Sequence, residues 1–301
     1  MTDAAAVAEG LRGQADLYAA LRRAGGGLRG SQADTLLPAV IDALGDAPEA
    51  ARLRAADGGL LRAVMRAGAG LAPVPGADAV RAALAGCDPA PVFDPDLAHA
   101  RTMALPCNGE RPDMPAFSDR AFDAWFAAQG VGYGLGLYGE DRPVYRSAQF
   151  ADAASPERRT RHLGIDVFAA PGTPVRAPLP GIVETVAFNA DPLDYGHTLI
   201  LRHDIRGAVF HTLCGHLAGT LPGLCRPGQA VAAGQVVAHL GDWPENGGWA
   251  AHLHLQVIAD RLDQRGGNVF GVGHAGLWDV WQAVSPDPAP LLRLSPEAFR
   301  P

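Results

Sequence analysis

The 301-residue sequence contains no lysine, so every permanently charged basic side chain is an arginine. A carrier protein that holds biotin or lipoate covalently needs an acceptor lysine, so this chain excludes that function. The formal net charge is −7, whereas proteins that bind nucleic acids present basic patches. We therefore expect no nucleic-acid partner.

Cysteine and long apolar runs are also scarce. The four cysteines show none of the paired spacing of a disulfide framework, and we interpret them as reduced thiols. No segment is apolar for long enough to span a bilayer, and the N-terminal residues lack the basic start and apolar core of a secretory signal. These absences predict a cytoplasmic protein without a membrane span; a periplasmic location would require that a signal has been removed.

The remaining pattern predicts an α+β fold in four parts. Apolar residues at three-to-four spacing predict a helical domain with a proline-rich connector over residues 1–115, including one helix over Ala50–Ala67. An adaptor helix and a glycine-rich segment follow over 116–150. Short apolar runs between glycines and prolines predict a mostly antiparallel β domain over 151–262, and a tail with a short helix occupies 263–301.

Gly134, Gly136 and Gly139 formally satisfy the glycine pattern of a dinucleotide-binding loop. However, Arg142-Pro143 stands where the helix of that motif should begin, and no acidic residue ends a second strand of an evident βαβ unit. We therefore interpret these glycines as a flexible lead-in to the β domain.

Histidines and one aspartate stand out in the apolar β region. His252 and His254 lie in a run that predicts a strand, where alternate residues point the same way, about 7 Å apart. Asp166 projects from a second apolar run, with His162 in the turn before it, and an unpaired carboxylate there would be costly. Two imidazoles and one carboxylate leave one free position on a tetrahedral zinc ion, as catalytic sites require.

Several motifs follow one another in a specific order. Arg161-His162-Leu163-Gly164-Ile165-Asp166 is followed by Gly172-Thr173-Pro174-Val175, by Gly215-His216-Leu217 and by His252-Leu253-His254. From about residue 140 to 260 the chain resembles the lysostaphin/LytM family of zinc metallopeptidases. The resemblance implies an antiparallel β domain of the duplicated-hybrid type, folded around a zinc cleft.

The same resemblance implies the roles of five residues. His162, Asp166 and His254 would bind one zinc ion per chain, while His216 and His252 would be the catalytic residues. The implied activity is that of a zinc endopeptidase, which cleaves a peptide bond near small residues by activating water. A peptidoglycan-type or muropeptide-like peptide is the expected substrate and partner.

Further residues are assigned to the surroundings of this site. Trp243 and Trp249 lie in a segment that departs from the family's usual Thr/Ser/Gly-rich stretch, and we expect them near the substrate rim. His203 and His211, on predicted strands near the site, are candidate outer partners of the metal ligands. Cys214 alternates with His216 and would share its face of the strand, as a buried structural thiol.

Three other functions stay open. A histidine phosphocarrier needs no lysine and could use similar glycine-rich β segments, but it would not explain Asp166 alongside His162 and His254. A catalytically degenerate zinc-binding scaffold or a cytoplasmic small-molecule amidase would also fit a metal site. The presence of both His216 and His252 favours catalysis over a scaffold.

Overall fold

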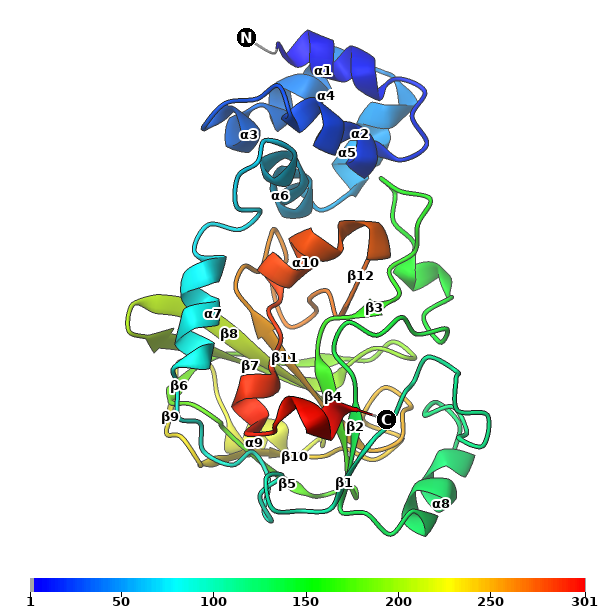
Figure 1. The fold of residues 1–301 in the computed structure, drawn as a ribbon, viewed down its shortest axis with the longest axis vertical. Coiled ribbons are helices and arrows are strands. Elements are labelled where there is room, and N and C mark those ends of the chain that lie inside the picture. The colour runs from blue at the N-terminus through cyan, green and yellow to red at the C-terminus, as the bar shows by residue number, and fades with distance from the viewer. Residues whose placement is uncertain (1–2, 301) are drawn as a thin grey trace.

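The computed structural model describes residues 3–300. Figure 1 shows small helices packed together at the N-terminal end of the molecule and a β-sheet domain at the other end. The helices are α1 (Ala4–Leu11), α2 (Leu17–Gly25), α3 (Gln32–Thr35), α4 (Leu37–Leu44), α5 (Pro48–Ala55), α6 (Gly58–Gly68), α7 (Ala77–Ala85), α8 (Ala121–Ala128), α9 (Leu221–Leu224) and α10 (Trp278–Val284). None of the helices in this range is long and apolar enough to cross a membrane.

The strands are β1 (Thr102–Ala104), β2 (Tyr133–Gly136), β3 (Arg161–His162), β4 (Ile165–Phe168), β5 (Pro174–Arg176), β6 (Gly181–Asn189), β7 (Gly196–Ile205), β8 (Ala208–Leu217), β9 (Ala230–Val231), β10 (Val236–His239), β11 (His252–Ile258) and β12 (Val272–Gly273). Eight of them form one sheet in the order β1-β2-β4-β11-β8-β7-β6-β9. Only the β1–β2 pair of this sheet is parallel. The predicted mostly antiparallel domain is thereby confirmed.

The prediction of one helix over Ala50–Ala67 is wrong. The chain breaks between α5 and α6 because Asp57, in an extended conformation, accepts a hydrogen bond from the Leu60 N–H and caps α6. Helix α6 then crosses α2 closely, since a Cβ added at Gly68 would lie 2.1 Å from the Arg22 carbonyl oxygen. Helices α1–α6 share an apolar core with α10, whose Trp281 is fully buried.

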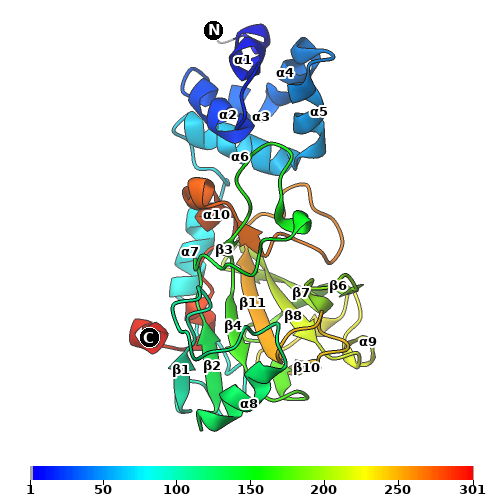
Figure 2. The same ribbon diagram turned by 90° about the vertical axis from the view of Figure 1, so that its right-hand side faces the viewer.

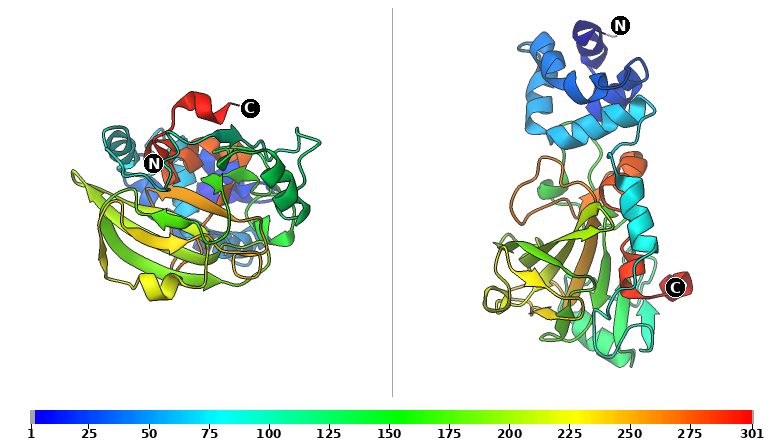
Figure 3. Two further views of the ribbon diagram at one scale, coloured as in Figure 1. Left: turned by 90° about the horizontal axis from the view of Figure 1, so that it is seen from below. Right: turned by 90° about the vertical axis from the view of Figure 1, so that its left-hand side faces the viewer.

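Helix α7 lies beside the sheet rather than among α1–α6 (Figures 1 and 3). Its Val80 and Leu84 enter the main core of the β domain. Figure 2, turned by 90°, shows β11 running through the middle of that domain, below α10. The segment that joins the helices to the sheet is therefore itself part of the sheet's packing.

The glycine-rich lead-in was predicted as a flexible segment, but the structure places two of its glycines in a buried strand. Gly134 and Gly136 belong to β2, an interior strand that is buried throughout. A Cβ at Gly134 would lie 2.3 Å from Leu105 Cδ1, and one at Gly136 would lie 2.8 Å from Arg142 Nη2. Both positions thus require glycine because side chains from neighbouring segments occupy the space.

The two faces of the sheet have different contents. Alternating residues of β4 and β11, such as Val167 and Leu255, enter the main apolar core. The intervening residues Asp166, His252 and His254 point to the opposite face, where they line a cleft. Alternation along two neighbouring strands therefore gathers the polar side chains on one side of the sheet.

Candidate metal centre

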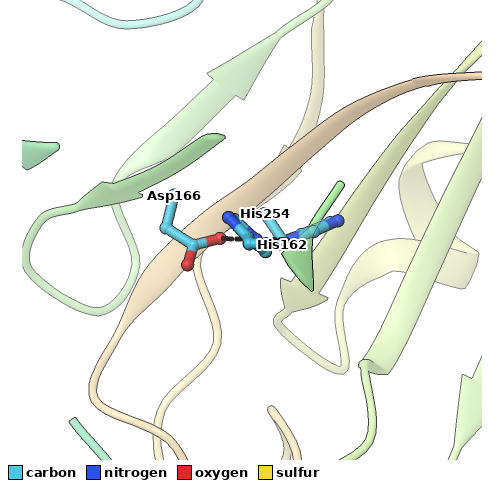
Figure 4. A group of neighbouring side chains, drawn as sticks. All are labelled: His162, Asp166 and His254. Carbon is cyan, nitrogen blue, oxygen red and sulfur yellow. Dashed lines mark hydrogen bonds and ion pairs between the residues drawn. The ribbon is translucent and has the colours of Figure 1, made fainter. Parts of the chain in front are cut away.

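Three predicted ligands meet at the centre of the sheet. His254 on β11 stands directly opposite Asp166 on β4, and His162 reaches them from β3. Asp166 Oδ1 lies 3.1 Å from His254 Nδ1 and 3.3 Å from His162 Nε2, and these two nitrogens are 2.9 Å apart. Figure 4 shows the three side chains converging on one point.

Each imidazole of this group is oriented by a second hydrogen bond. His162 Nδ1 lies 2.9 Å from the Leu137 carbonyl oxygen, and His254 Nε2 lies 3.1 Å from Gln256 Oε1. These nitrogens donate, because both partners are acceptors, so the other ring nitrogens present lone pairs to Asp166. Ligands about 2.0–2.1 Å from a tetrahedral metal lie about 3.3 Å apart, which the observed spacings approach. The donor set therefore fits a metal cation, and its ligand atoms lie within 4.8 Å of one another.

The charges at the centre also suit a cation. Burial lowers the pKa of His162 to about 4, so its ring is neutral at pH 7. Burial alone would raise the pKa of Asp166, but the positive charge of the neighbouring Arg142 outweighs burial and holds that pKa well below the usual range. A neutral imidazole and an ionised carboxylate are the forms that bind metal.

Arg142, which in the sequence stands only where the helix of a nucleotide-binding motif should begin, is part of this site. Its side chain is fully buried, with Nη1 2.6 Å from Asp166 Oδ2 and Nε 3.0 Å from Glu140 Oε2. Asp166 thus has one oxygen on the arginine and the other toward the imidazoles. The absence of a Cβ at Gly136 leaves room for this contact.

His216 and His252 lie beside the three-residue group, with ring centroids 4.2 Å apart. His252 Nδ1 donates to the Ala250 carbonyl at 2.7 Å, and His216 Nδ1 donates to the Asn246 carbonyl at 2.8 Å. Each ring therefore keeps an unprotonated Nε2, and that of His252 is 3.8 Å from Asp166 Oδ1. Burial lowers the pKa of both rings, so both are neutral at pH 7.

A left-handed backbone conformation brings His216 to the cleft. Gly215 is paired with His254, so regular alternation would point His216 to the opposite face. His216 has φ +62°, an uncommon conformation outside glycine that is often found at functional sites. The predicted shared face of Cys214 and His216 is therefore wrong: Cys214 is buried in the apolar core, while His216 lines the cleft.

The cleft has a volume of about 320 Å³. Trp249 lines it as a buried wall residue, stacked on Phe117 with ring centroids 4.9 Å apart. Trp243 does not line it. Its indole N–H donates to Asp123 Oδ2 at 2.7 Å, which ties the ring to α8 instead.

His203 and His211 are not outer partners of the ligands. His203 bonds to the Pro180 carbonyl and to Thr212 Oγ1, both at 2.8 Å, and His211 bonds to Glu184 Oε2 at 2.8 Å. Five residues of strand separate His211 from His216, which is about 16 Å at 3.3 Å per residue. The prediction that these histidines support the metal ligands is therefore wrong, because the length of the strands separates their rings from the metal centre.

Two further residues, Tyr195 and Asn246, shape the site but were not predicted from the sequence. Tyr195 lines the cleft, its ring 5.3 Å from that of His254, and its carbonyl accepts from the His216 N–H at 2.7 Å. Asn246 is fully buried, and its side-chain amide bonds to the backbone at Gly241, Gly248 and Trp249. It fixes the loop whose carbonyl holds His216. Neither residue stands in a recognisable motif.

A buried carboxylate and two imidazoles, with two more imidazoles in the same cleft, form a donor set of the kind found in catalytic metal sites. Residues 160–265 match the model of peptidase family M23. The matched range includes all five of His162, Asp166, His216, His252 and His254.

Individual proteins resemble the same region. An uncharacterized metalloprotease of Haemophilus influenzae is 32% identical over 133 residues, or 42% of this chain and 25% of that protein. This chain thus spans about a quarter of that relative's length. A zinc-containing peptidase from Vibrio cholerae is 26% identical, with a TM-score of 0.30 over 42% of this chain and 31% of that one. The catalytic domain of lysostaphin from Staphylococcus simulans is 23% identical, with a TM-score of 0.31 over 45% and 81% of the two chains.

Proposed function

We propose that the protein is a zinc-dependent peptidase with one zinc ion per chain, bound by His162, Asp166 and His254. The main support is the convergence of two lone-pair nitrogens and one carboxylate oxygen within 4.8 Å in a fully buried setting. Such a donor set suits zinc, and three protein ligands leave a position open for catalysis. When bound, zinc polarises a scissile carbonyl and lowers the pKa of water.

His216 and His252 would carry the proton transfers. Both present an unprotonated Nε2 to the cleft because both Nδ1–H groups donate to backbone carbonyls. One of the two takes a proton from the attacking water and delivers it to the leaving amine, while the other stabilises the charge that develops on the carbonyl oxygen. Their contact at 4.2 Å between centroids puts both within reach of one reacting group.

The expected substrate is a peptide with small residues beside the scissile bond. The stacked rings of Phe117 and Trp249 and the ring of Tyr195 narrow the cleft next to His216 and His254. Such walls favour glycine or alanine at the reacting centre, as in peptidoglycan-type bridges and stem peptides.

A cleavage screen tests this proposal. Zinc-loaded protein is incubated with glycyl peptides, alanyl peptides, muropeptides and simple amides, and the products are identified by mass spectrometry. We expect hydrolysis of at least one small-residue peptide, abolished by a chelator and restored by zinc. Zinc-loaded protein that cleaves none of them would favour the degenerate zinc-binding scaffold, and cleavage of simple amides alone would favour the small-molecule amidase.

A further inference from the structure

Arg159 lines the wall of the catalytic cleft, outside the group of five predicted site residues. Its guanidinium lies over the Phe270 ring at 4.7 Å from the centroid, and Nη2 donates to the Gln149 carbonyl at 2.7 Å. These two contacts hold the side chain in one orientation. Arg159 is therefore a fixed positive charge at the edge of the site rather than a mobile surface arginine.

The guanidinium of Arg159 lacks a carboxylate partner. It forms no ion pair with any acidic side chain of residues 3–300, and its Nε is buried without a hydrogen-bond acceptor. Asp152 is the acidic residue with the strongest electrostatic effect on the Arg159 guanidinium, but it does not form an ion pair with it. Its Oδ2 instead accepts a hydrogen bond from Tyr18 Oη at 3.0 Å. Arg142 differs sharply, because two carboxylates neutralise it. An arginine fork that is held in place but unpaired is suited to bind an anionic ligand group.

Two acidic side chains, Asp191 and Asp194, also line the cleft. Asp194 accepts from the Asn268 amide and from the Tyr195 N–H, both at 2.7 Å, and Asp191 lies on the same loop. These carboxylates disfavour an anion beside them, whereas Arg159 favours one. An anionic group of a bound ligand is therefore favoured at Arg159 rather than beside Asp191 or Asp194.

We propose that Arg159 is a carboxylate-binding subsite, so that the substrate is a peptide with a free carboxylate close to the scissile bond. This inference rests on the proposed peptidase function and names its substrate class. The carboxylate is either the C-terminus of a short peptide or an acidic side chain near the cleaved bond. In both cases it receives hydrogen bonds from the guanidinium while the small residue lies at the metal centre.

Matched peptides test the subsite by equilibrium binding. The first pair is N-acetyl-triglycine and its carboxamide, and the second is N-acetyl-Gly-Gly-Glu-amide and its Gln counterpart. Binding is measured by calorimetry on the full zinc-loaded chain carrying His252→Ala, which prevents cleavage. We expect the acid of at least one pair to bind about tenfold more tightly than the amide. The pair that shows the preference identifies the source of the carboxylate.

The arginine variants attribute this preference. Arg159→Gln, added to the same background, should reduce the acid-to-amide ratio to about one, and Arg159→Lys should retain part of it. The control is Arg158→Gln, an exposed neighbour outside the cleft, which should keep the full ratio. A preference that survives in Arg159→Gln would mean that the acid binds the metal, and no preference in either pair would also overturn the subsite.

The cleavage screen keeps the two proposals separable. If the zinc-loaded wild type cleaves no peptide but binds the acid more tightly than the amide in an Arg159-dependent way, the peptidase function is refuted and the carboxylate subsite is retained. If it cleaves a peptide but shows no preference for the acid, the peptidase function is supported and the carboxylate subsite is refuted.

Discussion

Arg142 and Asp166 form a fully buried ion pair, with Nη1 of the arginine 2.6 Å from Oδ2 of the aspartate. The two carboxylate oxygens of Asp166 have different partners: Oδ2 contacts the arginine, and Oδ1 faces the imidazoles of His162 and His254. Arg142 is held in turn by Glu140. The position of Asp166 is thereby fixed before any metal binds.

Arg142→Met should lower the stability of the metal-free protein. It leaves the carboxylates of Asp166 and Glu140 buried without a counter-charge, which costs about 3–5 kcal/mol in unfolding free energy. Urea denaturation of the chelator-treated protein measures this change. Glu140→Gln is the control and should cost less, because the Arg142–Asp166 pair remains; a loss below about 1 kcal/mol for Arg142→Met would show that the pair is unimportant.

Gly164→Ala should weaken metal binding. An added Cβ would lie 2.6 Å from His254 Cε1 and 2.8 Å from the Leu255 carbonyl oxygen, so the ring must move. Displacing one ligand should raise the zinc dissociation constant about 10–100-fold, as measured by competition with a chromophoric chelator. Gly223→Ala, where nothing lies within 4 Å of the added Cβ, should bind like the wild type. Equal affinities of the two variants would contradict the steric argument.

Asn246→Ala should separate activity from metal binding. The Asn246 side chain fixes the loop whose carbonyl accepts from His216 Nδ1, and it contacts none of the three ligands. We expect kcat on a cleaved peptide to fall about 100-fold through misplacement of His216, with zinc content unchanged. A variant that loses zinc as well would show that this loop supports the metal centre directly.

The buried His203 should make stability depend on pH. Burial lowers its pKa to about 4 in the folded protein, below the ordinary 6.5. The unfolded chain therefore binds a proton first as the pH falls, so the stability present above 6.5 is lost between 6.5 and about 4. The loss approaches about 3 kcal/mol. Urea denaturation across this range should show a shallower pH dependence for His203→Gln than for the wild type, and identical slopes would refute the shift.

Local sequence patterns predicted the main strands of the β domain and the shared direction of His252 and His254, whereas the set of three ligands was assigned from the resemblance to the zinc metallopeptidase family. His252 and His254 alternate along one strand, and Asp166 interrupts an apolar run on its neighbour, so their common face follows from a period of two. The same rule failed for His216, because a single left-handed residue at φ +62° reverses the face. Nothing in the flanking sequence predicts the left-handed conformation of His216.

The supporting contacts could not be predicted because they join segments far apart in the chain. Arg142 lies 24 residues from Asp166, and Asn246 lies 30 residues from His216. The glycines of β2 were interpreted by their local flexibility, whereas the packing of Leu105 and Arg142 against them requires glycine. Trp243 was placed at the rim by its sequence neighbours, and a hydrogen bond to α8 holds it elsewhere.

Whether His162, Asp166 and His254 bind zinc is tested by the zinc content of the wild type, His252→Ala and His254→Ala, purified side by side and measured by mass spectrometry. We expect about one zinc per chain in the wild type and in His252→Ala, and little in His254→Ala, because His254, unlike His252, shares a donor set with Asp166 and His162. Loss of zinc from His252→Ala with retention in His254→Ala would contradict the ligand assignment. Absence of zinc from all three, even after zinc is supplied, would contradict the metal centre itself.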